Sequence, residues 1–188
     1  MPELLRSIAR AVWHTIEFNL LCLHRKDVYL RKKGAIIGDG CNLIPDLANF
    51  GSEPYLIRIG DRVTITAGVR LVTHDASTRL FRDRYPNMNA RFGNLYGPIR
   101  IGSNCFVGVN TVLLPNTVIG DNSIVGAGAV VKGEFPAESV IAGVPARRIG
   151  SLDEYIASVQ EKMIPLQAQT EDELRRELLE RFNGDQGR

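Results

Sequence analysis

The run IGSNCFVGVNTVLLPNTVIGDNSIVGAGAVVKGEFP, residues 101–136, divides into consecutive units of six residues, or hexads. An aliphatic side chain opens every hexad: Ile101, Val107, Leu113, Ile119, Val125 and Val131. The fifth position of the first five hexads holds a small residue: Cys105, Thr111, Thr117, Ser123 and Ala129. A period of six matches neither the 3.6-residue turn of an α-helix nor the two-residue alternation of a long strand. It is typical of a short strand followed by a turn, three of which form one coil of a parallel β-helix.

The same pattern occurs upstream of this run. IGDRVT and ITAGVR follow one another from Ile59, Leu71 opens a third hexad, and IGDGCN from Ile37 is a weaker copy. The nine hexads counted from residues 59 and 101 correspond to three coils, each about 4.8 Å high. We therefore expect an all-β solenoid over residues 34–150, with stacked aliphatic side chains inside.

The repeat stops between Asp75 and Pro98, in a segment that contains four arginines and four aromatic residues. No residue pattern in this segment continues the stack, so we expect loop 75–98 to leave the coil without regular structure of its own. Long irregular loops in compact proteins usually carry function. The composition favours a loop that binds a ligand over one that is merely solvated.

Both flanks of the repeat predict α-helices, which divides the chain into segments 1–33, 34–150 and 151–188. The sequences SLDE (151–154) and TEDE (170–173) have the Ser/Thr-x-x-Glu form of a capping box. Near the start, apolar residues recur at helical spacing: Leu4, Leu5, Ile8, Val12, Trp13, Ile16 and Leu20.

The N-terminal helix admits two interpretations. It packs against the coils or another subunit, or it touches a membrane surface, because Trp13 and Phe18 precede a basic run at residues 24–33. No apolar stretch approaches the roughly 20 residues of a membrane span, and no signal-peptide pattern is present. The three cysteines have no paired spacing, which favours a reducing compartment. We expect a cytoplasmic protein, with the inner face of the membrane as the alternative.

Charge and histidine content argue against two classes of function. The net charge is only +2, and the basic residues are dispersed, so nucleic-acid binding is not supported. Zinc sites need three or four protein ligands, usually His or Cys. The chain has three histidines, and His74 is the one that lies beyond residue 24. We expect no metal.

His74 lies at the last ordered position before loop 75–98, at a mouth formed by coil and loop. Histidine titrates near neutral pH, so a histidine at such a place can remove a proton from a hydroxyl or an amine. Glu53 and Asn49 both precede His74 by slightly more than three hexads, which is close to the length of one coil. Two roles are open for Glu53, which either orients the imidazole or caps the local turn, and Asn49 is a candidate contact to the acceptor.

Three stretches together carry a family resemblance: the hexads from 101, VIAGVPARRIG at 140–150, and FGSEPYLIRIGDRVTITAGVRLVTHDAS at 50–77. They resemble the left-handed β-helix acyltransferases with hexapeptide repeats, and within these the sugar O-acetyltransferases of capsule and O-antigen synthesis. The likeness covers residues 34–160. It implies a left-handed parallel β-helix, a homotrimer, acetyl-CoA as donor, and active sites between neighbouring subunits.

The resemblance also implies roles for individual residues. The catalytic histidine of the family falls on His74, which deprotonates the acceptor hydroxyl during direct transfer in a ternary complex, without an acetyl-enzyme. A backbone N–H near Gly108 or Val109 would stabilise the oxyanion. The pantetheine arm would run past Val109 and Ala127.

The charged ends of the two substrates imply further contacts. Lys132, Arg147 and Arg148 are the candidates for the coenzyme phosphates. Related enzymes often have Thr-Lys-Asp where this chain has Lys132-Gly133-Glu134, which displaces the lysine by one position. For the acceptor sugar or glycan the candidates are Asn49, Asp75, Arg79, Arg82 and Tyr85.

The sequence leaves three alternatives to a sugar O-acetyltransferase. One is an N-acetyltransferase of an amino-sugar nucleotide, and another is an antibiotic O-acetyltransferase. The third is a β-helix that serves only as an assembly scaffold. That scaffold would not explain why the loop begins beside the one histidine of the repeat region.

Overall fold

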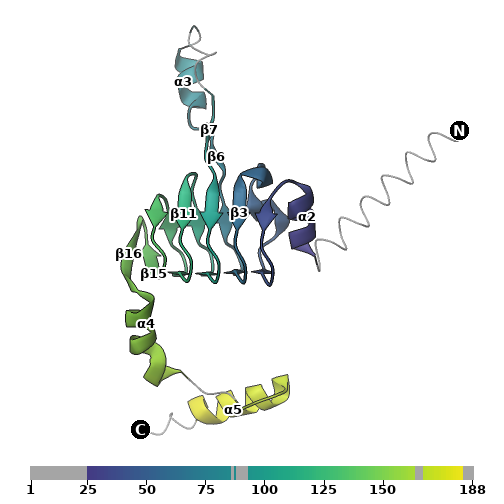
Figure 1. The fold of residues 1–188 in the computed structure, drawn as a ribbon, viewed down its shortest axis with the longest axis vertical. Helices are drawn as coiled ribbons and strands as arrows, with labels where there is room; N and C mark the ends of the chain where they lie inside the picture. Colours follow the sequence, from purple (N-terminus) through teal and green to yellow (C-terminus); the bar gives the residue numbers. More distant parts are fainter. Residues whose placement is uncertain (1–24, 86, 88–92, 164–166, 184–188) are drawn as a thin grey trace, which may run out of the picture. The chain divides into compact units, whose positions relative to one another are not determined.

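The computed structural model describes residues 25–85, 87, 93–163 and 167–183 (Figure 1). The helix predicted at residues 4–20, with its two interpretations, lies outside these ranges. None of the described helices is long and apolar enough to cross a bilayer. The chain divides after Glu154 into two units, which are treated separately below.

The repeat region forms three sheets, A, B and C, which the chain visits in that order (Figure 1). Sheet A contains β1 (Ile36–Ile37), β3 (Ile57–Ile59), β8 (Ile99–Ile101), β11 (Thr117–Ile119) and β14 (Glu134–Phe135). Sheet B contains β2 (Asn42–Leu43), β4 (Thr64–Ile65), β9 (Phe106–Val107), β12 (Ile124–Val125), β15 (Ser139–Gly143) and β16 (Ala146–Ser151). Sheet C contains β5 (Arg70–Leu71), β10 (Val112–Leu113) and β13 (Val130–Val131).

The strand register confirms that three hexads complete one coil. Thr117 pairs with Ile99 in sheet A, and Val130 pairs with Val112 in sheet C, so stacked partners are separated by three hexads. All pairs within the three sheets are parallel except β15 with β16. The predicted aliphatic first positions, from residue 101 to residue 131, are at most 3% exposed and form the core.

The fourth position of the hexads holds an asparagine that turns the chain at four corners. Asn104, Asn110, Asn116 and Asn122 have φ between 54° and 65°. Asparagine tolerates this left-handed conformation better than other residues with a side chain. The Asn104 amide also donates to the Asn122 side-chain oxygen in the next coil, at 2.8 Å.

The first coil has no strand in sheet C. In its place the chain forms a 3-10 turn, η1 (Leu47–Phe50), which packs against β5, and a second one, η2 (Pro54–Leu56), which leads into β3. Phe50 is fully buried and fills the interior where strand residues would otherwise stack. The segment between η1 and η2 is thereby brought against the end of β5.

The prediction that loop 75–98 lacks regular structure is wrong. The chain leaves the coil as β6 (His74–Asp75) and returns as β7 (Leu95–Tyr96), which pair antiparallel, and α3 (Arg79–Arg84) lies between them (Figure 1). The Gly97 N–H donates to the Thr73 carbonyl at 3.0 Å and closes the base of the hairpin. Backbone N–H and C=O groups of a chain that leaves a sheet need new hydrogen-bond partners. Strands β6 and β7 provide these partners for each other.

Short helices flank the coils. In the first unit, α2 (Lys26–Lys32) precedes β1 and buries Leu30. Further on are α4 (Leu152–Val159), η4 (Gln160–Lys162) and α5 (Glu171–Asn183). Both predicted capping boxes are confirmed, since Ser151 with Glu154 and Thr170 with Glu173 exchange reciprocal backbone-to-side-chain hydrogen bonds.

The alternation within β10 yields a test of the stacked core. Leu113 is fully buried, whereas its neighbour Val112 points to the opposite side of the strand. Leu113→Ala should lower the free energy of unfolding by about 2–5 kcal/mol, because it leaves a cavity inside the stack. Val112→Ala should cost less than about 1 kcal/mol. Equal losses for both variants in denaturant titrations would contradict the inward stacking.

Candidate active site

His74 lies at the corner between sheets C and A, where the chain leaves β5 and enters β6. Its Nδ1 lies 2.9 Å from Oε2 of Glu53. The Thr73 hydroxyl donates to the same carboxylate oxygen at 2.5 Å. Glu53 is 8% exposed and Thr73 is 1% exposed. The structure therefore brings together three residues that come from two neighbouring coils.

The charge of Glu53 fixes the direction of the hydrogen bond to His74. Burial acts to raise the pKa of Glu53, but the hydrogen bonds from Thr73 and His74, and the attraction to the imidazole, outweigh it and lower the pKa from its ordinary value. A carboxylate that is ionised at neutral pH can only accept hydrogen bonds. In the neutral form of His74, Nδ1 then carries the proton and Nε2 presents its lone pair as a proton acceptor.

Gly51 allows the segment with Glu53 to approach Thr73 this closely. Its φ of 70° and ψ of 177° lie in a region that is open essentially to glycine alone. A Cβ at this position would lie 2.7 Å from Oγ1 of Thr73 and 2.9 Å from the Leu71 carbonyl oxygen. Any larger residue would push the Glu53 segment away from His74.

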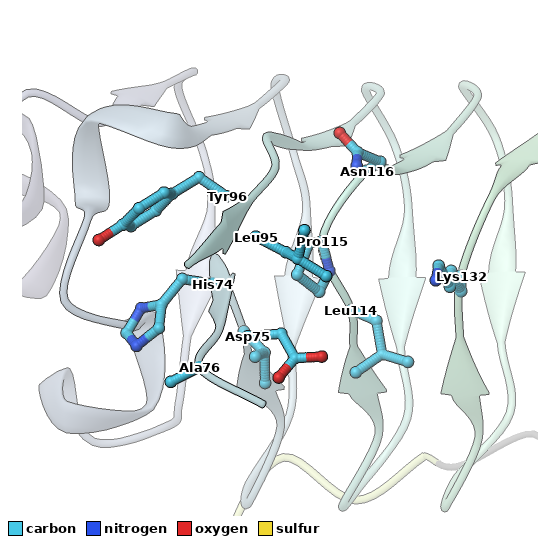
Figure 2. A pocket seen from close by; sticks show the side chains of 10 residues that line it. His74, Asp75, Ala76, Leu95, Tyr96, Leu114, Pro115, Asn116 and Lys132 are labelled. Atoms are coloured by element: carbon cyan, nitrogen blue, oxygen red, sulfur yellow. The ribbon is translucent and has the colours of Figure 1, made fainter. Parts of the chain in front are cut away.

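Within the described part of the chain, cavities of two sizes border His74. The larger has a volume of about 400 Å³, with apolar walls that include Val72, Leu114 and Pro115, and with Lys132 at its edge (Figure 2). The smaller has a volume of about 230 Å³, and polar and apolar surface contribute about equally to its lining, with the polar side chains coming from Asn49, Ser52, Arg70, Thr73 and His74. The imidazole thus lies between two spaces of different chemical character.

Two of the predicted acceptor residues lie at these cavities. Asn49, in η1, lines the smaller one. Asp75 lines the larger one, and its carboxylate accepts a hydrogen bond from the Ser77 N–H at 2.8 Å, which lowers the pKa of Asp75. Figure 2 shows the side chains of His74 and Asp75 pointing in different directions, as expected for neighbours on an extended strand.

Two of the three loop candidates are not brought to these cavities. Arg79 begins α3, Tyr85 follows it, and both are exposed. Neither lines a cavity beside His74. Arg82 lies within the backbone of the same helix, and its side chain is outside the described part of the structure.

Lys132 is the predicted coenzyme contact that reaches the larger cavity. It follows β13 and occupies the same corner as Leu114 of the preceding coil and Val72 of the coil before that. Arg147 and Arg148 lie instead in β16 at the end of sheet B, where both are exposed. These two arginines line neither cavity beside His74.

One of the two predicted oxyanion donors is already engaged. The Gly108 N–H donates to the Val125 carbonyl at 2.8 Å, and a Cβ on Gly108 would lie 2.5 Å from the Ala127 nitrogen. Gly108 is therefore required by the close stacking of coils, and its N–H is not free. Val109 is 45% exposed, and among the described residues no acceptor is recorded for its N–H.

Val109 and Ala127 lie at a different corner from His74. They belong to the turns between sheets B and C, whereas His74, Leu114 and Lys132 lie beyond the strands of sheet C. The candidate residues for chemistry and for coenzyme binding are thus divided between two edges of one stack. Neither Val109 nor Ala127 lines a cavity beside His74.

The sequence reasoning missed several residues around the imidazole. Tyr96 pairs with His74 across the hairpin, and the two ring centroids are 5.6 Å apart. Asn116 lines the larger cavity. Thr73 could have been found, because a polar residue beside His74 at a buried hexad position needs a partner. Tyr96 could not, because its place depends on the unrecognised hairpin.

In residues 25–85, 87, 93–163 and 167–183, no group of three or more His, Cys, Asp or Glu side chains is placed to hold a metal ion.

Comparison with known proteins identifies the family. Residues 98–133 match the bacterial transferase hexapeptide model of six repeats. Over 133 residues, the chain is 43% identical to Protein CapG of Staphylococcus aureus, an alignment that covers 70% of this chain and 74% of CapG. The chain therefore belongs to the bacterial hexapeptide-repeat transferases, and the family predicted from the sequence is confirmed. The similarity to CapG covers far more residues than the match to the repeat model.

Solved acetyltransferase structures align with part of this chain. The hexapeptide-repeat acetyltransferase VCA0836 of Vibrio cholerae aligns with a TM-score of 0.49 and 28% identity, over 62% of this chain and 61% of VCA0836. The chain thus spans about three fifths of that protein. A maltose O-acetyltransferase of Clostridium difficile 630 aligns with a TM-score of 0.46 and 25% identity, over 68% of this chain and 74% of the enzyme. VCA0836 has also been crystallised in complex with acetyl-CoA.

The shared carboxylate oxygen yields a titration test. Thr73→Val keeps the shape of the side chain but removes one donor, so the pKa of Glu53 should rise. The pKa of Glu53 is lowered in the folded protein, so its contribution to stability is present above the unfolded-state pKa and is lost as the pH falls through the folded pKa. NMR titration of labelled glutamate side chains measures the shift. Thr64→Val, in β4, is the matched control, and an unchanged Glu53 titration in Thr73→Val would contradict the network.

Proposed function

We propose that the protein is an acetyl-CoA-dependent O-acetyltransferase that acts on a sugar hydroxyl in surface-polysaccharide synthesis. The observation that carries the proposal is the pair His74 and Glu53, which leaves Nε2 of His74 as a proton acceptor between two cavities. Family membership and the similarity to CapG support the reaction class. A coenzyme of central metabolism as donor implies that the reaction takes place in the cytoplasm.

The proposed reaction uses His74 as general base. Nε2 takes the proton of the acceptor hydroxyl while the acceptor oxygen forms a bond to the acetyl carbonyl carbon. The carbon–sulfur bond of the thioester then breaks, and Nε2 returns the proton to the departing thiolate. Acetyl-CoA supplies the activated acyl group when bound. Glu53 keeps the proton on Nδ1 throughout and balances the charge that His74 gains.

The division of candidates between two corners supports a site shared by two subunits. Val109 offers an N–H for the oxyanion, yet it lies across sheet C from His74 of its own chain. A neighbouring copy that presents its Val109 and Ala127 to this His74 would complete the donor site. We therefore propose a homotrimer of left-handed coils, with residues 34–150 as the catalytic body and the segments 1–33 and 151–188 as flanking elements.

The residues present fit a coenzyme of this kind. The apolar wall formed by Val72, Leu114 and Pro115 suits a pantetheine arm, and Lys132 supplies a cation at the edge of the same cavity. Arg147 and Arg148 are exposed in β16 and remain candidates for the phosphates. The acceptor hydroxyl would approach His74 from the smaller cavity.

Replacing His74 by Ala tests the general base. The kcat with acetyl-CoA and a sugar acceptor should fall by about 10²–10⁴-fold, because the hydroxyl loses its proton acceptor. Binding of acetyl-CoA, measured by calorimetry, should stay within about threefold of the wild-type value. Transfer at the wild-type rate in His74→Ala would exclude the mechanism, and no binding of acetyl-CoA at millimolar concentration would favour a scaffold.

Replacing Glu53 by Gln tests its positioning role. Glutamine keeps the volume but no longer guarantees the tautomer of His74, so kcat should fall by about 10²-fold or more. Glu53→Asp should restore part of the loss. Combined with His74→Ala, Glu53→Gln should add little, since both residues act as one unit. Additive losses in the double variant would show that Glu53 acts independently, for example only by capping its turn.

A further inference from the structure

We propose that the smaller cavity beside His74 is the acceptor pocket and that Arg70 selects acceptors carrying a carboxylate or a phosphate near the reacting hydroxyl. This inference rests on the proposed acetyl transfer to a hydroxyl. It adds the chemical class of the acceptor and the residue that recognises it.

The two cavities are unlike each other in a way that assigns their roles. The larger one presents apolar walls from Val72, Leu95, Leu114 and Pro115, which suit an extended apolar arm. The smaller one has a larger polar share, with Asn49, Ser52 and Arg70 in its lining, and its volume of about 230 Å³ is below the roughly 300 Å³ at which pockets for larger ligands begin. A single sugar ring is an appropriate occupant for a space of this size and polarity.

The polar groups of the smaller cavity can all donate hydrogen bonds, and the Arg70 guanidinium can only donate. Arg70 contributes a guanidinium group with five N–H bonds, Asn49 an amide, and Ser52 a hydroxyl. The Glu53 carboxylate is buried and already accepts hydrogen bonds from Thr73 and His74. A ligand rich in oxygen acceptors therefore complements the pocket better than one rich in donors.

Arg70 is not neutralised by the rest of the chain. In the described part of the structure no carboxylate lies within ion-pairing distance of its side chain, and no hydrogen bond from it is recorded. Its cross-strand partner in sheet C is Val112, whose own next partner is Val130. Arg70 is therefore a lone cation on an otherwise apolar column, placed at the wall of a cavity that contains the proposed base.

A guanidinium group binds carboxylates and phosphates through two parallel hydrogen bonds, which fixes the orientation of the ligand. An acceptor held in this way by Arg70 would keep one hydroxyl within reach of His74, which lines the same cavity. A uronic acid and a sugar phosphate both provide such an anion. Their shared chemistry is what the pocket recognises, and the test separates the two sources.

The test compares three acceptors that differ only at C6: methyl glucoside, methyl glucuronide and methyl glucoside 6-phosphate. Acetyl transfer is followed by release of the coenzyme thiol and by the mass of the product. In the wild-type protein, kcat/KM should be at least about tenfold higher for one or both anionic acceptors. Equal kcat/KM for all three acceptors would overturn the inference and leave the proposed transfer to hydroxyls intact.

The variant Arg70→Gln should reduce the preference for the anionic acceptor over the neutral one by about 10–100-fold, because it removes a charged pair of hydrogen bonds. Arg70→Lys should retain part of the preference. Arg58→Gln is the matched control, since Arg58 is also an exposed arginine within a β-strand but lines neither cavity. A preference unchanged in Arg70→Gln, or lost equally in Arg58→Gln, would rule out Arg70 as the selecting residue.

A binding measurement keeps the inference testable when no acceptor is acetylated. Calorimetric or NMR titration of the intact protein should show tighter binding of the glucuronide or the phosphate than of the neutral glucoside, and Arg70→Gln should abolish the difference. Selective binding without any transfer would contradict the proposed function while supporting the pocket. Failure of both anions to bind above the neutral glucoside would overturn the inference.

Discussion

The stacking of one coil directly on the next determines everything else in the first unit. Stacked strands are held about 4.8 Å apart by their backbone hydrogen bonds, and inward side chains such as Leu71, Leu113 and Val131 lie one above another. The turns at the corners are separated by the same distance as the stacked strands, so there is no room for a Cβ at Gly108. Variation is therefore confined to places where the chain can leave the stack without disturbing the strands above and below.

The corner between sheets C and A is such a place, and each coil builds it differently. One coil extrudes the hairpin that begins at His74, and the next makes a compact turn from Leu114 to Asn116. In the last coil the spacing between stacked partners becomes shorter. Leu113 in sheet C pairs with Val131, which is three full hexads further along the chain. Val118 in sheet A pairs with Glu134, which comes before three hexads are complete. The turn at Lys132 is correspondingly shorter. Because the successive turns at this corner differ in size, their side chains do not pack completely against one another. The larger cavity lies along these turns.

Much of this architecture was predictable from the sequence, because a side chain that must fit inside a coil in every hexad leaves a visible pattern. The core positions from Ile101 to Val131 and both capping boxes follow from such local rules. The hairpin of β6 and β7 was not predictable in this way, since pairing between His74 and Tyr96 has no repeat to reveal it. At the site, a spacing near one coil suggested Glu53, but its contact with Thr73 and His74 depends on how η1 and η2 fold, which the hexad pattern does not encode.

The missing sheet C strand of the first coil connects the base to the acceptor pocket. Because η1 and η2 replace that strand, the path from Glu53 to His74 is longer than the three hexads of a regular coil, and Glu53 is turned beneath the imidazole. The same replacement exposes Arg70 beside η1 and opens the smaller cavity between them. The replacement of this strand by η1 and η2 thus has two effects. It orients Nε2 of His74, and it shapes the cavity from which an acceptor hydroxyl would reach that nitrogen. Changes in the length of this segment should alter acceptor choice and the orientation of His74 together, because no backbone element separates the two functions.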